Sequence, residues 1–174
     1  MAKAMIQPLV YVDACVYLDL IIRNSQTDKE SDEQRWRVAK KVFDAVNGDQ
    51  VRLASSSLIE AEVCCNGSAR RESERVRHLI RGWFTARSTV WTEVDRHLAR
   101  EAVRIMNEHR QKAAGKTKMS AADALHLAAA ARLQCDYFMT QDEGFPIGHK
   151  IEGLQVIRPQ VVWPEQLFAQ ASGG

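Results

Sequence analysis

The sequence predicts an α/β fold, a three-layer α/β/α sandwich with a mostly parallel central sheet. Short runs rich in β-branched and aromatic residues recur along the chain, as expected of strands. Longer stretches between them repeat apolar residues at helical spacing. Strands that alternate with helices favour a parallel sheet covered on both faces. The expected strands span residues 9–12, 51–54, 88–94, 136–140 and 154–159.

Length and composition are those of one globular unit. The 174 residues are 45% apolar and 26% charged, a balance that argues against disorder. We expect a single domain over residues 1–170 and a loose tail over residues 171–174. The N-terminal segment lacks an apolar run long enough for export or membrane spanning, so we expect a cytoplasmic protein. The four cysteines form no CxxC pair, which indicates buried free thiols rather than a zinc or redox site.

The helices of the first half are expected from apolar spacing and from their end signals. The first strand ends at Asp13, and a helical stretch follows over residues 15–23. A second helix is expected to open with a capping box and to stop at Asn47-Gly48, and a third to begin near residue 57. The two expected capping boxes are Ser31 with Gln34 and Ser57 with Glu60.

Three further helices are expected downstream. One presents an apolar face, a second covers residues 95–111, and the third is an alanine-rich helix capped by Ser120. A basic, flexible connection over residues 112–118 separates the last two. The face of the first of these helices consists of Val76, Leu79, Ile80, Trp83 and Phe84.

Four acidic residues lie where the fold predicts a ligand site. Ligands of open parallel sheets bind beyond the carboxyl ends of the strands. Carboxylates that converge there repel one another unless cations lie between them, and such oxygen-rich sites suit Mg²⁺ or Mn²⁺. Divalent ions of this kind support phosphodiester cleavage. The four acids are Asp13, Glu62, Asp123 and Asp142.

Each of these acids also has a purely structural explanation. Asp13 is placed to cap the next helix, and Asp123 lies in a first helical turn, where the helix dipole favours an acid. Glu62 could be a solvated helix residue, and Asp142 a turn former. Taken singly, the four acids therefore do not establish a metal site.

Four segments give these acids a common setting. They are VYVDACVYLDL, SSLIEAEVCCNG, SAADALHLAAAA and DYFMTQDEGF. Together they resemble, in order, the motifs of PIN domains, particularly the VapC-type toxins, from about residue 9 to Phe168. The second segment has a Ser six residues before Glu62, which selects Glu62 over Glu60 as the acid of that motif.

The resemblance implies a metal-dependent endoribonuclease that uses Mg²⁺ or Mn²⁺. Its metal ligands would be Asp13, Glu62, Asp123 and Asp142, and Thr140 would position a water or a carboxylate. It also implies an RNA substrate, an antitoxin partner and a homodimer. Two departures from the family are Cys15, where a small polar residue is common, and a chain longer than a minimal toxin.

Two other functions remain open at this point. One is a PIN-like module that binds RNA without cleaving it, against which the four intact acids argue. The other is a haloacid-dehalogenase-type phosphatase, which also begins with an Asp after a strand. That class requires a second Asp two residues later, where this chain has Cys15.

Other residues have weaker signals. His126 lies one turn after Asp123, where we favour a packed, hydrogen-bonded histidine over an orienting one. We expect Asp19 to face solvent or the rim of the site, and Cys64 and Cys65 to pack in the core. The net charge of +2 is small, but basic clusters could follow a phosphate backbone. One cluster is Arg70, Arg71, Arg75, Arg77 and Arg81; the other is Arg100, Arg104, Arg110, Lys112, Lys116 and Lys118.

Overall fold

The computed structural model describes residues 7–112 and 118–163, which contain one mixed sheet. Its strands are β1 (Leu9–Val12), β2 (Arg52–Ser56), β3 (Val90–Thr92), β4 (Tyr137–Met139), β5 (Lys150–Ile151) and β6 (Leu154–Ile157). Their order across the sheet is β3-β2-β1-β4-β6-β5. All neighbours pair in parallel except β5, which runs antiparallel to β6 and was not expected from the sequence. The predicted α/β fold with a mostly parallel sheet is confirmed.

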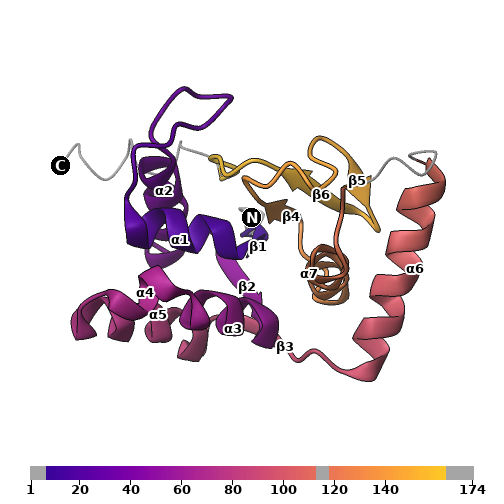
Figure 1. Ribbon diagram of the computed structural model, residues 1–174, viewed down its shortest axis with the longest axis horizontal. Helices are drawn as coiled ribbons and strands as arrows, with labels where there is room; N and C mark the ends of the chain where they lie inside the picture. The colour runs from indigo at the N-terminus through magenta and orange to yellow at the C-terminus, as the bar shows by residue number, and fades with distance from the viewer. Residues whose placement is uncertain (1–6, 113–117, 164–174) are drawn as a thin grey trace, which may run out of the picture.

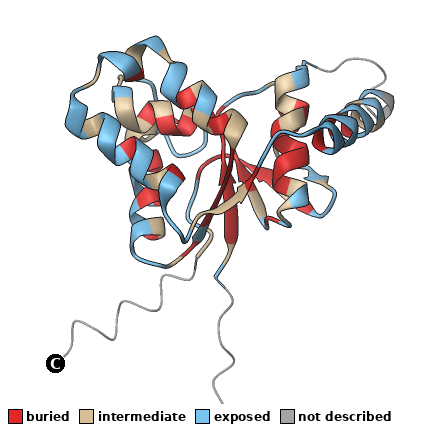
Figure 2. Cartoon of the chain, turned by 90° about the horizontal axis from the view of Figure 1, so that it is seen from below, coloured by how far each residue is buried: buried red, intermediate tan, exposed pale blue. Residues whose placement is uncertain are grey.

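Helices cover the sheet in two groups. The first group contains α1 (Ala14–Ile22), α2 (Arg35–Asn47), α3 (Ser57–Cys65), α4 (Gly67–Arg71) and α5 (Glu74–Thr85). The second contains α6 (Arg96–Lys112) and α7 (Ala121–Arg132), which pack on each other. Figure 1 shows the first group on the left and the second on the right. In Figure 2 the buried strands lie between the two groups, as in a three-layer sandwich.

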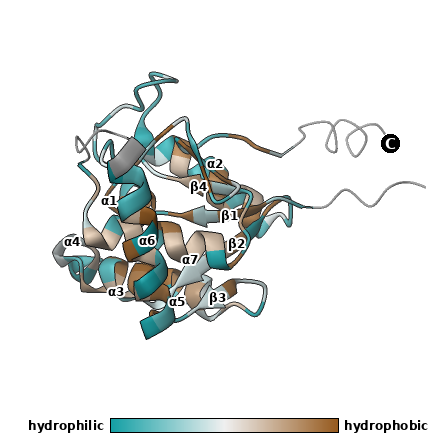
Figure 3. Ribbon diagram, turned by 90° about the vertical axis from the view of Figure 1, so that its right-hand side faces the viewer, coloured by the Kyte–Doolittle hydropathy of each residue, from teal (hydrophilic) through white to brown (hydrophobic). Residues whose placement is uncertain are grey.

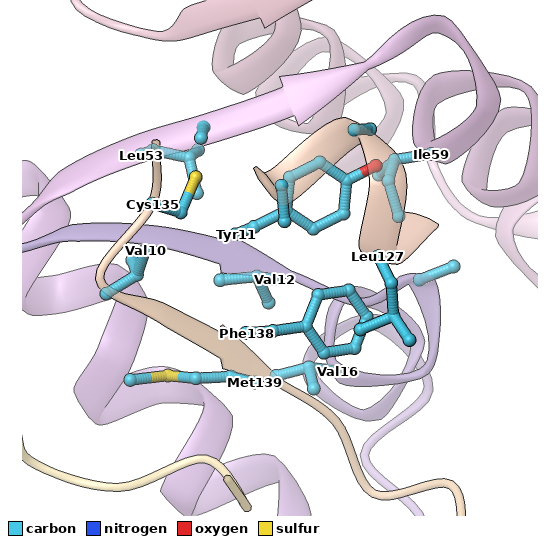
Figure 4. Packing of buried hydrophobic residues seen from close by; sticks show 14 of the residues in the cluster. Val10, Tyr11, Val12, Val16, Leu53, Ile59, Leu127, Cys135, Phe138 and Met139 are labelled. Carbon is cyan, nitrogen blue, oxygen red and sulfur yellow. The ribbon is translucent and has the colours of Figure 1, made fainter. Parts of the chain in front are cut away.

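The core lies on both faces of the central strand. Every residue of β1 is buried, as its apolar sequence predicts for a strand covered on both sides. The rings of Tyr11 and Phe138, from neighbouring strands, stack with their centroids 5.5 Å apart. Figure 4 shows Phe138 beside Leu127 of α7. This packing fixes the position of β1 and therefore of the residue that follows it.

The alanine-rich sequence of α7 lets it pack closely against the sheet. Ala124, Ala128 and Ala130 are buried, and Ser120 caps the helix as expected from the sequence. Asp123 completes a capping box with Ser120, which was not expected. The outer helix α6 is amphipathic: Leu98 is buried, whereas Val103 is exposed. Figure 3 shows both hydrophilic and hydrophobic residues along α6.

Three expectations for the region of α3 to α5 are wrong. The N-cap of α3 is Ser56 rather than Ser57, and β2 runs two residues beyond the expected strand end at residue 54. Ser57 instead accepts a hydrogen bond from the backbone N–H of Val94. Leu79 is 55% exposed, because the buried stripe of α5 is narrower than its apolar run. Cys64 and Cys65 are exposed at the end of α3, so they are not core residues.

Within the described residues, we find no helix that has both the length and the apolar composition needed to cross a bilayer.

Candidate functional site

The site begins with Asp13, directly after the central strand. Although Asp13 is the N-cap residue of α1, its side chain makes no capping hydrogen bond. The backbone N–H of Asp13 donates to the carbonyl of Met139, which holds the ends of β1 and β4 together. The carboxylate is therefore free for contacts beyond the sheet edge, and the simple capping explanation does not account for it.

Two neutral donors hold the Asp13 carboxylate in place. The hydroxyl of Thr140 donates to Oδ2 at 2.7 Å, and the thiol of Cys15 donates to the same oxygen at 3.0 Å. Burial raises the pKa of the Cys15 thiol well above its usual value, so the thiol stays protonated and acts as a donor. Across the described part of the chain, Oδ1 of Asp13 accepts no hydrogen bond. One oxygen is thus anchored and the other is open.

Burial also raises the pKa of Asp13, because the charged form loses its hydration. The charge of His126 opposes this increase, as do the Cys15 and Thr140 donors, whereas the nearby charge of Glu62 adds to it. In the described chain, no Lys or Arg side chain forms an ion pair with Asp13 or Glu62. Among the described residues, the buried carboxyl group therefore has no Lys or Arg to balance its charge, and the basic side chain beside it is His126.

His126 joins Asp13 and Glu62 in one group. One potential ligand atom from each residue lies within 4.8 Å of those of the other two. The Nε2 atom of His126 is 3.0 Å from Oε2 of Glu62, and His126 itself is buried. The expectation of a packed, hydrogen-bonded histidine is thus met, but its position beside both acids was not foreseen. The sequence signal for it was its spacing of one turn from Asp123.

Asp123 and Asp142 lie at a second point of the same edge. Asp123 Oδ2 accepts the backbone N–H of Ser120 at 2.6 Å within the capping box. Asp142 Oδ1 accepts the N–H of Gly144 at 2.8 Å. A Cβ atom at Gly144 would lie 3.2 Å from the Asp142 oxygen and 3.6 Å from the Asp123 oxygen. These two acids are therefore neighbours of one glycine, outside the group of Asp13, Glu62 and His126.

Thr140 links the two parts of the site. Its hydroxyl oxygen accepts the backbone N–H of Asp142 at 2.9 Å while its proton goes to Asp13. This bond fixes the start of the loop after β4 relative to the end of β1. A side chain that was expected to position a carboxylate does contact one here.

Asp19 is buried, which corrects the expectation that it faces solvent. It lies on α1, and Oδ2 is 3.3 Å from Nε of Arg35, on α2. Burial raises the pKa of Asp19 to about 6, although Arg35 lowers it. The negative charges of Asp13 and Asp28 contribute to the increase. The sequence missed this pair because Arg35 follows a loop whose path cannot be read from spacing.

A buried polar network around Gln141 was also missed. Its amide nitrogen donates to Asp28 Oδ2 at 2.8 Å, and its amide oxygen accepts from Arg158 at 3.2 Å. Asp28 further accepts from the backbone N–H groups of Glu30 and Ser31. Ser31 is thus engaged inside the loop rather than in a capping box, and α2 begins after Gln34 without a side-chain cap. The network ties the loop before α2 to the residue next to Thr140.

A cavity of about 730 Å³ lies elsewhere, between α6, α7 and the strands β4 to β6. Its lining includes Arg104, Arg132 and Lys150 and none of the four acids. The acidic edge is instead open: the Glu62 side chain is 35% exposed, and Asp142 is exposed. An open edge suits a long substrate that lies across it.

Comparison with known proteins assigns the chain's fold. Residues 10–147 match the family model of the PIN domain. A search of curated proteins finds no significant match. Three solved structures are similar at 15–19% identity, at which the likeness shows the fold alone.

The first is a toxin–antitoxin complex from Klebsiella pneumoniae, with a TM-score of 0.55 over 87% of this chain and 99% of that chain, at 19% identity. The second is Mycobacterium tuberculosis VapC20, described as a Sarcin-Ricin loop cleaving toxin. The match has a TM-score of 0.56 and 16% identity, and it covers 86% of this chain and 99% of that chain. The third is FitAcB from Neisseria gonorrhoeae. The match has a TM-score of 0.50 and 15% identity, and it covers 86% of this chain and 97% of that chain.

The raised pKa of Asp13 predicts how an Asp13→Asn variant responds to pH. Because the folded pKa lies above the unfolded value of about 3.9, the native state binds more protons, and stability is lost as pH rises through this window. In EDTA, the variant should melt at a higher temperature than the wild type at pH 7. This difference in melting temperature should become smaller toward pH 3. Calorimetry at both pH values measures this, and a difference that is larger at pH 3 contradicts it.

Proposed function

The chain belongs to the PIN domain family, and from this premise we propose that it is a metal-dependent endoribonuclease that hydrolyses RNA phosphodiester bonds. The observation that supports this most directly is the Asp13 carboxyl group, which is buried beside Glu62 without a Lys or Arg partner in the described residues. A divalent cation would supply the missing positive charge. The haloacid-dehalogenase alternative is set aside, since the family match covers the segment on which it rested.

The donor set fits a divalent cation. We propose Asp13, Glu62, Asp123 and Asp142 as metal ligands, because each offers a carboxylate at one sheet edge. Asp123 and Asp142 each have one oxygen bound to backbone N–H, which fixes their direction and leaves the other oxygen. When bound, Mg²⁺ or Mn²⁺ would stabilise charge on the phosphodiester and favour ionisation of a water.

The residues of the chain have defined roles in this proposal. Thr140 and Cys15 hold Oδ2 of Asp13, which leaves Oδ1 available to the metal. Thr140 also orients Asp142 through its backbone N–H. Water, rather than a side chain, attacks the phosphorus, so no covalent enzyme intermediate forms. A non-catalytic RNA-binding module is less well supported, because such a module has no need of a buried acid without a cationic partner.

The basic cluster on α4 and α5 is proposed to hold the RNA backbone. Its five arginines are exposed, and within the described residues none of them forms an ion pair. Arg77 and Arg81 border Cys64 near the end of α3, the helix that also contains Glu62. On α6, by contrast, Arg104 binds Glu101, Glu108 and Glu152, which neutralise it. The α4–α5 surface is therefore the better phosphate track.

We further propose that the enzyme is the toxin of a toxin–antitoxin pair, acting in the cytoplasm. Two of the similar structures are described as a toxin and as a toxin–antitoxin complex, which supports this biological context. The partner would be a small antitoxin that places an Arg or Lys among the carboxylates. The family resemblance also supports a homodimer.

The first test separates Glu62 from Glu60. Glu62→Gln should abolish cleavage of single-stranded RNA, because it removes a metal ligand. Glu60→Gln, in the first turn of α3, should retain cleavage and cost about 1 kcal/mol of stability or less. Cleavage of a labelled RNA is measured with Mg²⁺, with Mn²⁺ and with EDTA. Full activity of Glu62→Gln, or of the wild type in EDTA, would overturn the mechanism.

The second test concerns the phosphate track. Arg77→Ala with Arg81→Ala should weaken RNA binding, and the slope of log affinity against log salt should fall by about 0.7 for each lost contact. Fluorescence anisotropy in EDTA measures binding without cleavage. Arg100→Ala, an exposed arginine on α6, is the matched control and should bind like the wild type. If only the Arg100→Ala variant loses RNA affinity, the phosphate-binding surface lies on α6 instead.

The third test concerns the toxin. Expression of the protein alone should arrest bacterial growth, and Asp13→Asn should restore it because the cleavage site is lost. The native operon should yield a stoichiometric small partner whose removal switches on RNA cleavage. Harmless expression of a protein that cleaves RNA in vitro, with no partner recovered, would indicate a housekeeping nuclease.

A further inference from the structure

The group of Asp13, Glu62 and His126 contains a nitrogen donor among carboxylates. Ligand atoms that share one cation at about 2.0–2.3 Å lie roughly 3–4.5 Å from one another. The three potential ligand atoms already lie within 4.8 Å of one another, which is close to this range. Only a small closure would bring them onto one ion. An imidazole among the ligands also affects which cation the site would prefer.

The His126 ring is held with Nε2 toward the two acids. His126 is 2% exposed, and the Tyr11 ring packs against it with the centroids 6.1 Å apart. Its Nδ1 atom is 3.2 Å from the Tyr11 hydroxyl, and its Nε2 atom is 3.0 Å from Glu62. The imidazole is thus bonded on both sides and cannot turn away without breaking a buried hydrogen bond.

The contacts behind His126 are compatible with the tautomer that a metal ligand needs. The Tyr11 hydroxyl lies 2.7 Å from the Ser56 hydroxyl, so it can donate to Ser56 and accept from Nδ1–H of His126. In that arrangement Nε2 presents a lone pair that a cation would occupy beside Glu62. Without a cation, Nε2–H instead donates to Glu62 and Nδ1 accepts from Tyr11. Metal-bound histidines are commonly held this way, with the second ring N–H donated to a fixed acceptor.

We propose that Nε2 of His126 is a metal ligand beside Asp13 and Glu62, and that the site therefore prefers a transition-metal ion such as Mn²⁺, Co²⁺ or Zn²⁺ over Mg²⁺. This rests on the metal dependence in the proposed function. The affinity of a site with nitrogen donors rises from Mn²⁺ through Co²⁺ among the first-row metals, whereas Mg²⁺ favours oxygen ligands and keeps several waters. The Tyr11 hydroxyl acts through His126 and is a positioning group. Cys15 lies outside this group of three and donates to Asp13 Oδ2 instead.

A purely structural role for His126 makes a different prediction. The Glu62–His126 hydrogen bond connects α3 to α7, so its loss would lower stability whatever ion is present. A ligand role instead changes the ratio of Mn²⁺ to Mg²⁺ affinity. That ratio is the quantity to measure, because a general loss of stability leaves it unchanged.

The experiment measures metal binding to the metal-free protein by calorimetry, without RNA. The wild type should bind Mn²⁺ at least about tenfold more tightly than Mg²⁺. His126→Gln should weaken Mn²⁺ binding about 10- to 100-fold, with a smaller effect on Mg²⁺. Tyr11→Phe, which keeps the ring and removes the acceptor, should reduce the same ratio by less. His149→Gln, at an exposed histidine, is the matched control and should match the wild type.

A second measurement does not depend on any variant folding. In nitrogen NMR spectra of the wild type, Zn²⁺ should shift Nε2 of His126, one of the five histidines, and leave its Nδ1 protonated. An unshifted Nε2, or an unchanged Mn²⁺ to Mg²⁺ ratio in folded His126→Gln, overturns the inference. RNA cleavage by the wild type would then still support the proposed function. Conversely, selective Mn²⁺ binding without any RNA cleavage would support the ligand and contradict the nuclease.

Discussion

A carboxyl group buried at the end of the central strand is the constraint on which the site depends. Asp13 is 6% exposed, and an ionised carboxylate in such a place is costly unless donors or cations compensate for its lost hydration. The chain supplies two uncharged donors, Thr140 and Cys15, and both act on the same oxygen. They fix the direction of the carboxylate without neutralising it. The surrounding sheet, with Tyr11 stacked on Phe138, prevents the group from relaxing outward.

Much of this arrangement follows from the sequence because it depends on local patterns. Apolar runs that alternate with helical spacing predict the parallel sheet, and the end of the first run places Asp13 at its edge. The Ser120 cap places Asp123 in the first turn of α7, since a capping box involves only four consecutive residues. These features are determined within a few residues of the chain.

The remaining features depend on contacts between distant segments, which spacing cannot supply. His126 and Glu62 meet only because α3 and α7 reach the same sheet edge. The burial of Asp19 depends on Arg35, which a loop of irregular path brings back to α1. Gln141 has an ordinary polar sequence context, yet it joins Asp28 to Arg158 in the interior. Leu79 is the opposite case. Its spacing places it on the apolar face of α5, yet it is exposed because no other described segment covers it.

Gly144 shows how the packing limits sequence variation at the acidic edge. Its backbone lies so close to Asp142 and Asp123 that a methyl group would press on the Asp142 oxygen at 3.2 Å and also meet the carbonyl of Lys118. Space rather than backbone conformation favours glycine here, because a Cβ atom would require the Asp142 side chain to shift slightly. Positive backbone φ values among the described glycines occur at Gly148 and Gly153 instead. In evolutionary terms, a substitution at position 144 would also change the positions of the Asp142 and Asp123 carboxylates. Natural variants of this chain that keep both acids should therefore keep the glycine, whereas variants that have lost the acids are free to replace it.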